Sequence, residues 1–492
     1  MAERDGSSDI LLALDQARTG KFHIKTLFTA GMGFFSDAYD LFVTSTALPI
    51  IVAVFGITSG HNIFGTGTIG PLSAVSVETG LIGSMALFGA FLGALVFGRI
   101  ADLKGRRYIY GLEMSILVVF ALVSALSTSI LMLIISRFIL GVGVGGDYPV
   151  SSTIMSEFSN VRNRGKMVLS VFAMQGFGLL FGSLVGLVAI HFLPLDYAWR
   201  FMLGFGAVPA ASVIYLRRRI KESPRYSLEA GDARKAAQAV EAATGKQVKV
   251  SYDVVDTRKI PTSFIIRRYW FILLGTAGSW FLFDMAFYGT SINSGQILSE
   301  IGYGAVAGNL RATIFNIATG NAILAGIFAV PGYWIAVGLV DRVGRKRLQW
   351  MGFTAIAIIY FIFALKYVYI TRDLTMFVAL YGMSYLFGNI GPNSTTFLLP
   401  TELFPTEFRT TGHGISASSG KLGAGIFTFL IPVIEALYGL QTVLGTLAII
   451  AALGAVLTVI TISETKNRSL EQTSQAPLIR DEKINPGSKL WP

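Results

Sequence analysis

Long apolar runs, separated by short polar loops, make up most of the chain. About twelve of them approach the ~20 residues that an α-helix needs to cross the hydrocarbon core of a membrane. These runs lie at residues 27–55, 78–101, 108–128, 130–156, 166–193, 199–216, 269–298, 311–340, 348–370, 374–400, 411–438 and 441–463. The pattern predicts an all-α membrane protein with twelve transmembrane helices.

The composition agrees with a chain that is solvated by a lipid bilayer. Of the 492 residues, 53% are hydrophobic and 14% are charged, whereas soluble domains carry about 25% charged residues. The net charge of +11 would indicate a nucleic-acid partner in a soluble protein, but here the basic residues fall in short loops between apolar runs. We therefore expect no nucleic-acid partner. The chain has no cysteine, which excludes disulfides and cysteine metal sites, and we expect neither a metal nor a cofactor.

Alternate loops differ in their charge. The basic loops hold Lys104, Arg106 and Arg107, then Arg162, Arg164 and Lys166, and then Arg342, Arg345, Lys346 and Arg347. Because cytoplasmic loops carry the excess of Lys and Arg, this pattern places these loops and both termini in the cytoplasm. The N-terminus lacks the short apolar core of a cleaved signal peptide. We expect a retained tail and a location in the plasma membrane.

One polar stretch in the middle of the chain separates six apolar runs from the other six. Within it, Ser227 to Thr244 has the pattern of a short helix that lies on the surface. The stretch is too short to bury a core of its own, so we interpret it as a linker. The predicted organisation is a cytoplasmic tail (1–24), a six-helix half (25–219), a cytoplasmic linker (220–268), a second six-helix half (269–463) and a cytoplasmic tail (464–492).

The two halves repeat each other. The repeated acidic positions, each set in a similar local sequence, are Asp102 and Asp341, Glu157 and Glu402, and Glu222 and Glu464. Their offsets are all roughly half the chain, and a shared offset indicates duplicated structural units. Two similar halves with a site between them near the midplane are typical of secondary transporters.

Several carboxylates lie inside the predicted spans, where a charge is costly and commonly marks an ion or substrate path. Asp147 and Tyr148 follow a glycine-rich stretch in the fourth span, and we expect both to line a transport pathway. Arg137 lies about three helical turns upstream, so the alternative is a structural ion pair between Asp147 and Arg137. Glu113 also lies within a span, and its role cannot be read from the sequence.

The doubled loop motif resembles the signature of the major facilitator superfamily, G-x-x-x-D-x-x-G-R-[RK]. The resemblance implies that fold, with two pseudo-symmetric six-helix halves. It also implies a cytoplasmic gate, because the Asp and Arg side chains can bond to helix ends and acidic groups; the alternative is that they only determine topology. The predicted gate residues are Asp102, Gly105, Arg106, Glu157, Asp341, Gly344, Arg345 and Glu402.

A finer resemblance, over nearly the whole chain, is to the phosphate:proton symporter family. It rests on the acidic pair in GFFSDAYDLF, on GVGVGGDYPVSSTIMSE, and on the spaced Trp, Asp and Tyr of the seventh span. The middle loop is shorter than in the eukaryotic members of that family. The substrate-site residues that the resemblance implies are Tyr148, Gln175, Trp280, Asp284, Tyr288, Asn393 and Lys421.

The residue types suit a small oxyanion. Trp280, Asp284 and Tyr288 are spaced by four and share one helical face, where the indole and phenol can donate hydrogen bonds. An ionised Asp284 accepts from the hydroxyls of dihydrogen phosphate, which sulfate lacks; alternatively it is protonated or paired with Lys421. The structural alternative for this set is aromatic core packing.

Coupling to protons needs a carrier inside the membrane. Asp37, Asp40 and Asp147 are the candidates, with Arg137 as the cation that a protonation step would release. A static ion-pair network is the alternative.

These observations favour a monomeric secondary active transporter that imports inorganic phosphate with protons by alternating access. The alternatives are a transporter of a sugar, an organic acid or an organic ion, and a nutrient receptor that does not transport. An enzyme is not expected, since no phosphate-cradling loop, HExxH motif or nucleophile elbow is present.

Overall fold

The computed structural model describes residues 12–16, 19–57, 68–69, 72–220, 222–245 and 262–474. In this part of the chain, 12 helices are long and apolar enough to cross a membrane. The prediction of an all-α membrane protein with twelve spans is therefore confirmed. Parts of the predicted tails and linker fall outside the described residues.

The first six spans form the N-terminal half. They are α2 (Lys21–Val54), α3 (Ala74–Lys104), α4 (Arg106–Ile109) with α5 (Leu112–Ala125), α6 (Ile130–Phe158), α7 (Arg164–Phe192), and α8 (Leu195–Phe205) with α9 (Ala207–Arg218). The last six form the C-terminal half. They are α12 (Thr262–Ile292), α14 (Leu310–Ile323) with π-helical η2 (Leu324–Ala329) and α15 (Val330–Val343), α16 (Arg345–Ile370), α17 (Leu374–Gly388) with π-helical η3 (Asn389–Asn393) and α18 (Ser394–Leu403), α19 (Arg409–Tyr438), and α20 (Leu440–Thr461).

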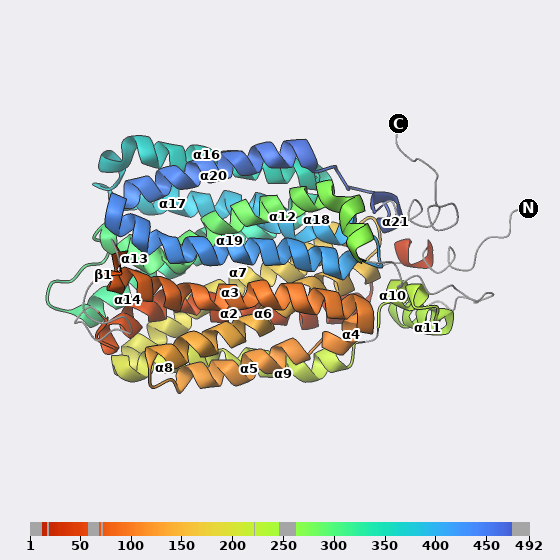
Figure 1. Ribbon diagram of the computed structural model, residues 1–492, viewed down its shortest axis with the longest axis horizontal. Coiled ribbons are helices and arrows are strands. Elements are labelled where there is room, and N and C mark those ends of the chain that lie inside the picture. Colours follow the sequence, from red (N-terminus) through yellow and green to blue (C-terminus); the bar gives the residue numbers. More distant parts are fainter. Residues whose placement is uncertain are drawn as a thin grey trace, which may run out of the picture.

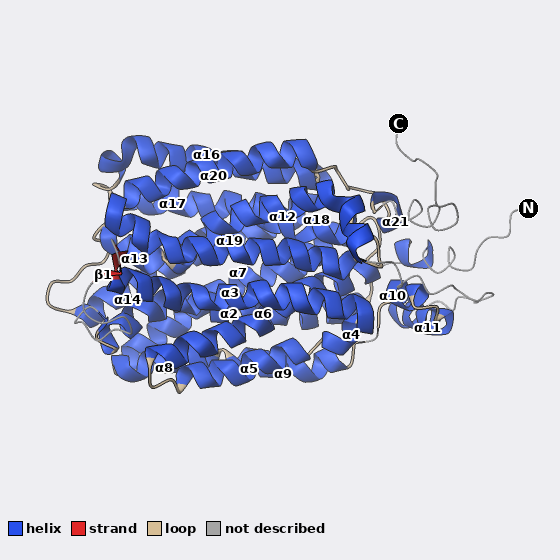
Figure 2. Cartoon of the chain, viewed as in Figure 1, coloured by secondary structure: helices blue, strands red, loops and turns tan. Residues whose placement is uncertain are grey.

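Short elements lie at the two ends of the bundle (Figure 1). One end carries α10 (Pro224–Glu229), α11 (Ala233–Thr244) and α21 (Leu470–Thr473), and we call it the linker face. The opposite end, the far face, carries α13 (Ser294–Glu300) and the antiparallel pair of β1 (Thr68–Ile69) and β2 (Leu72–Ser73). Figure 2 shows that helices make up most of the rest of the described chain.

The halves meet along two sets of helices, α3 with α19 and α7 with α14 and α15. Within the N-terminal half, α3 also packs closely on α6, and the glycines of α6 make that approach possible. A Cβ atom at Gly141 would lie 2.0 Å from the carbonyl oxygen of Ala86, and one at Gly145 would lie 2.1 Å from that of Ala90. The glycine-rich stretch before Asp147 thus allows the backbones of α6 and α3 to pack closely.

The structure corrects three sequence-based boundaries. The linker helix predicted over Ser227–Thr244 is two helices, α10 and α11, separated by a turn in which Gly231 has a φ of 79°. The sixth span ends at Arg218 rather than 216, which brings Arg217 into the bundle. The seventh run, predicted over 269–298, divides into α12 and α13, which begins at Ser294.

Candidate functional site

Glu157 lies at the centre of one ion-pair cluster on the linker face. Its Oε1 is 3.2 Å from Nη2 of Arg106 and 2.9 Å from Nη1 of Arg409. The hydroxyl of Ser223 donates to its Oε2. Glu157 and Arg106 belong to the N-terminal half and Arg409 to the C-terminal half, so the cluster joins the halves.

Glu402 is the centre of a second cluster with the same design. Its oxygens lie 2.9 Å from Nη2 of Arg345 and 3.0 Å from Nε of Arg164, and Oε2 accepts from Thr465 Oγ1 at 2.5 Å. Arg164 again comes from the opposite half. The side chains of Glu402, Arg164 and Arg345 are all essentially inaccessible to solvent.

The aspartates of the repeated loop motif, Asp102 and Asp341, add further contacts between the halves near both clusters. Oδ2 of Asp102 accepts from the backbone N–H of Thr411 at 2.6 Å, and Oδ2 of Asp341 accepts from that of Lys166 at 2.9 Å. Each carboxylate thereby contacts the start of a helix in the other half, where the helix dipole favours negative charge. Gly105 and Gly344, with φ of 102° and 106°, form the sharp turns between these aspartates and the arginines.

All eight predicted gate residues therefore converge on the linker face, in two related clusters. The sequence did not identify the arginines of the opposite half, Arg164 and Arg409. A signal was available, because Arg164 follows Glu157 and Arg409 follows Glu402, each by seven positions. Each arginine pairs with the glutamate of the other half. The repeated Glu222 and Glu464 accept from the backbone N–H groups of Arg106 and Arg345, at 3.2 and 3.0 Å respectively.

The centre of the bundle holds a buried ion pair between two helices of the C-terminal half, α19 and α12. Lys421 Nζ lies 2.9 Å from Oδ2 of Asp284, and both side chains are almost completely inaccessible. The ammonium also lies 3.9 Å from the ring centroid of Tyr288 and 4.4 Å from that of Tyr148. Oδ1 of Asp284 has no hydrogen-bond partner within the described chain.

Hydroxyl and amide groups surround this pair. The hydroxyls of Tyr148 and Tyr288 lie 2.9 Å apart. Gln175 Oε1 accepts from Tyr148 at 3.4 Å, while its Nε2 donates to Tyr288 at 3.3 Å. Tyr148 and Gln175 belong to the N-terminal half and Tyr288 to the C-terminal half, so the polar centre is shared by both.

Trp280 and Asn393 lie at the border of this centre. The Trp280 ring is 6.2 Å from that of Tyr148 and 5.4 Å, edge to face, from His413. His413 is fully buried near the start of α19. Asn393 Nδ2 donates at 2.7 Å to Tyr333, which the sequence analysis did not identify.

A separate charged cluster lies in the N-terminal half. Arg217 donates from Nη1 and Nη2 to the two oxygens of Asp147, both at 2.7 Å, and from Nη1 to Glu113 at 2.7 Å. The carboxylate of Asp147 also accepts from Ser151 at 2.5 Å. The suggested pairing of Asp147 with Arg137 is therefore wrong. Arg217 takes that place because it lies inside the bundle.

Arg137 contacts another of the predicted proton carriers, Asp40, through its backbone. Its Nη2 donates to the backbone carbonyl of Asp40 at 2.6 Å and to Thr44 Oγ1 at 2.8 Å. The carboxylate oxygens of Asp40, and those of Asp37, accept no hydrogen bond from the described residues. Asp37 lies beside Asp147 and Arg217. The structure thus brings Asp37 and Asp147 together and keeps Arg137 with Asp40.

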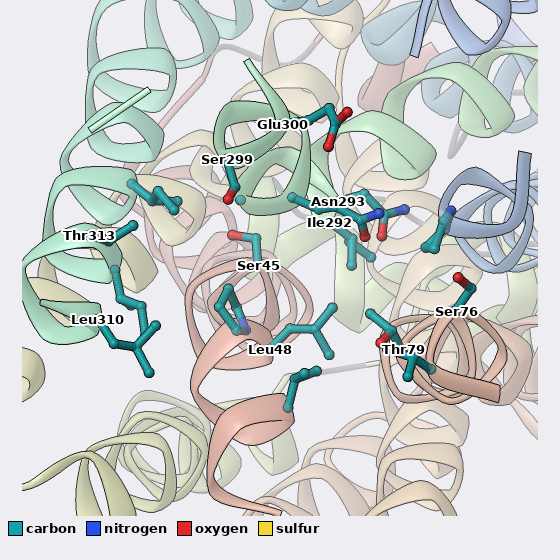
Figure 3. Close-up of a pocket in the computed structure, with 18 residues that line it drawn as sticks. Ser45, Leu48, Ser76, Thr79, Ile292, Asn293, Ser299, Glu300, Leu310 and Thr313 are labelled. Atoms are coloured by element: carbon teal, nitrogen blue, oxygen red, sulfur yellow. The ribbon is translucent and has the colours of Figure 1, made fainter. Parts of the chain in front are cut away.

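A cleft of about 300 Å³ opens between the halves near the far face. Figure 3 shows Ser45 of α2, Asn293 just after α12 and Ser299 of α13 around this space. A second, much smaller void is also lined by Ser45 and has Phe42 in its wall. The Phe42 ring stacks on Tyr288 with centroids 5.3 Å apart. The cleft thus lies toward the far face, while ion pairs join the halves at the linker face.

Comparison with known proteins gives one consistent result. Residues 26–476 match the family "Sugar (and other) transporter". A probable inorganic phosphate transporter 1-7 of Arabidopsis thaliana is 36% identical, over 95% of this chain and 94% of that protein. Inorganic phosphate transporter 1-1 of Oryza sativa subsp. japonica is also 36% identical, over 96% of this chain and 97% of that protein.

Among solved structures, the fold is similar to that of the major facilitator superfamily proton:xylose symporter XylE bound to 6-bromo-6-deoxy-D-glucose. The TM-score is 0.75 at 18% identity, over 93% of this chain and 99% of that one. The predicted major facilitator fold is confirmed. The chain belongs to the sugar (and other) transporter family, alongside the plant proteins named inorganic phosphate transporters.

Proposed function

We propose that the protein imports inorganic phosphate together with protons by alternating access of its two halves. The names of relatives at 34–37% identity over most of the chain support the substrate. The observation that carries the proposal is the buried pair of Lys421 and Asp284 among three neutral hydrogen-bonding side chains contributed by both halves. A site built from both halves can close from either side of the membrane.

The charges at this site fit a protonated oxyanion. Lys421 supplies one positive charge, and the hydroxyls and amide around it can donate to oxygen atoms. The free Oδ1 of Asp284 is an acceptor for an O–H of the substrate. Dihydrogen phosphate has such groups, whereas sulfate would place an unprotonated oxygen against a carboxylate. Selection of phosphate over sulfate follows from this one acceptor.

Asp37 and Asp147 are the proposed proton carriers. Both are buried, and they lie side by side near Arg217, which also pairs with Glu113. Two adjacent carboxylates that share one cation cannot both ionise without repulsion. A proton on Asp37 is therefore coupled to the Asp147–Arg217 pair, which connects α2, α6 and α9. We propose that loss of this proton favours the return of the empty transporter.

The ion pairs of the linker face are the proposed gate. Glu157, Glu402 and their arginines hold the halves together there, while the cleft lies at the opposite end. This arrangement corresponds to a transporter closed toward the linker face. From the basic loops we propose that this face is cytoplasmic and that the protein resides in the plasma membrane. That it acts as a monomer stays a prediction.

The direct test is uptake of radiolabelled phosphate into proteoliposomes under an imposed inward proton gradient. Uptake should collapse with a protonophore, and excess unlabelled phosphate should compete while sulfate should not. The variant Asp284→Asn keeps the shape of the side chain and should lose uptake. The matched control is Asp373→Asn, which makes the same chemical change at the capping residue of the exposed start of α17. Absence of phosphate uptake in sealed vesicles would overturn the proposal and direct attention to organic substrates.

A further inference from the structure

The hydroxyl of Tyr333 lies beside the polar side chains that surround the central pair. Asn393 donates to it at 2.7 Å, and Gln175 and Tyr288 lie next to it. The side chain is 1% exposed, and Asp284 is close enough to interact with it electrostatically. Tyr333 is therefore part of the polar centre, although its sequence neighbourhood gives no sign of this.

The backbone directs Tyr333 there. It follows the π-helical segment η2, whose extra residue per turn changes the face on which later side chains emerge. Pro331 stands at the start of α15. Across the interface, Gly176 of α7 leaves room for the ring, because a Cβ atom there would lie 2.8 Å from Cδ2 of Tyr333. Tyr333 thus reaches across the boundary between the halves.

The hydrogen-bond directions determine what Tyr333 can offer a substrate. Asn389 Nδ2 donates to the carbonyl of Ala329 at 3.5 Å, which leaves its Oδ1 to accept from Asn393 at 2.7 Å. Nδ2 of Asn393 therefore donates to both Asn389 and Tyr333. The phenolic oxygen of Tyr333 is an acceptor in this contact, so its own hydrogen remains available for donation.

We propose that Tyr333 is a substrate-binding residue that donates its O–H to a phosphate oxygen, and that Asn393 acts partly through it by fixing the hydroxyl. This inference rests on the proposed function of the central site. Hydrogen bonds to charged groups contribute more than those between neutral groups. The loss of this one hydroxyl should therefore weaken binding measurably without removing the ring that fills the space beside Gly176.

The test is Tyr333→Phe, which removes one oxygen and keeps the packing. The KM for phosphate uptake should rise roughly tenfold, with the maximal rate little changed. The matched control is Tyr381→Phe, another fully buried tyrosine of the C-terminal half, whose hydroxyl donates to the carbonyl of Thr290 at 3.0 Å. That control should leave KM unchanged.

A double variant separates direct from indirect action. If Asn393 acts through Tyr333, Asn393→Ala in the Tyr333→Phe background should add less to KM than it does alone. An unchanged KM in Tyr333→Phe, or a fall in maximal rate alone, would overturn the inference while the wild type still transports phosphate. Failure of the wild type to take up phosphate would instead overturn the proposed function itself.

Discussion

Arg217 and Asp147 meet through two parallel hydrogen bonds of 2.7 Å inside the N-terminal half. Bidentate pairs of this kind are the strongest that a carboxylate makes with a side chain. The position is crowded as well as charged, since a Cβ atom at Gly33 would lie 1.5 Å from Nη2 of Arg217. Helix α2 therefore passes directly over the pair and places Asp37 next to it.

The first prediction concerns proton coupling at this pair. Asp147→Asn removes the negative charge but leaves Arg217 bound to Glu113, so we expect a folded protein. Phosphate exchange across the membrane at equal pH should persist, whereas accumulation driven by a proton gradient should be lost. Counterflow and gradient-driven uptake in the same proteoliposome preparation measure the two. Asp373→Asn, at the exposed start of α17, is the matched control and should retain gradient-driven uptake. Equal accumulation by Asp147→Asn would contradict the proposed role.

The second prediction concerns Lys421 and Asp284. Removal of one member of a buried ion pair leaves an uncompensated charge and typically costs about 3–5 kcal/mol. Lys421→Gln and Asp284→Asn should therefore each unfold at a lower temperature than the wild type in detergent. The double variant should lose less stability than the two single variants combined, because it leaves no unpaired buried charge.

None of these three variants should transport phosphate, since each lacks the cation, the carboxylate or both. Phosphate should raise the unfolding temperature of the wild type only. A double variant as unstable as the two single changes combined would show that the two charges are not coupled in the folded protein. A stabilising effect of phosphate on Lys421→Gln would exclude Lys421 as the anion ligand.

The sequence was sufficient for those parts of the site that depend on one helix at a time. Tyr288 follows Asp284 by one turn, so their common face could be predicted from spacing, and the ion pair with Lys421 was one of the expected alternatives. The partner of Asp147 could not be predicted. It depends on how the last turn of α9 packs, which places Arg217 inside the bundle.

Tyr333 illustrates a second limit. In a regular helix, the spacing along the chain would determine the face on which Tyr333 emerges. The π-helical segment η2 adds a wider turn just before α15 and so changes that face. Such a turn has no fixed sequence pattern. The gate shows the opposite case, since Asp102 and Asp341 recur at one offset and occupy equivalent places. The gate could be predicted from the sequence because its residues are duplicated, whereas Tyr333 could not, because its position depends on a local irregularity of the helix.

The third prediction concerns the attachment of α21 on the linker face. Arg225 Nε lies 3.0 Å from Oε1 of Glu471, and its Nη1 donates to the carbonyl of Glu157 at 2.7 Å. Burial raises the pKa of Glu471, but the charge and hydrogen bond of Arg225 outweigh it and lower the pKa from 4.5 to about 2. The carboxylate therefore stabilises the attachment fully above its ordinary pKa, and this contribution is lost as the pH falls toward 2.

Amide hydrogen exchange of α21, corrected for the intrinsic rate at each pH, should accordingly show constant protection between about pH 6 and pH 8. Glu471→Gln should reduce that protection roughly tenfold across the same range. Asp232→Asn removes an exposed pair with Lys235 and serves as the control without effect. Protection in the wild type that already falls between pH 8 and pH 6 would show that another group controls the attachment.

The last prediction concerns the gate, and the absence of cysteine from the chain makes it direct to measure. Ser416→Cys introduces a single thiol at a buried position of α19, inward of the Asp102 contact with Thr411. Glu402→Gln removes the charge that holds Arg164 and Arg345, so the linker face should open more often. A water-soluble maleimide should then label the thiol several-fold faster. Because the two clusters have the same design, Glu157→Gln should act in the same direction, whereas Asp232→Asn should not. Labelling that is equally slow in both glutamate variants would mean that the ion pairs fix topology and do not control access.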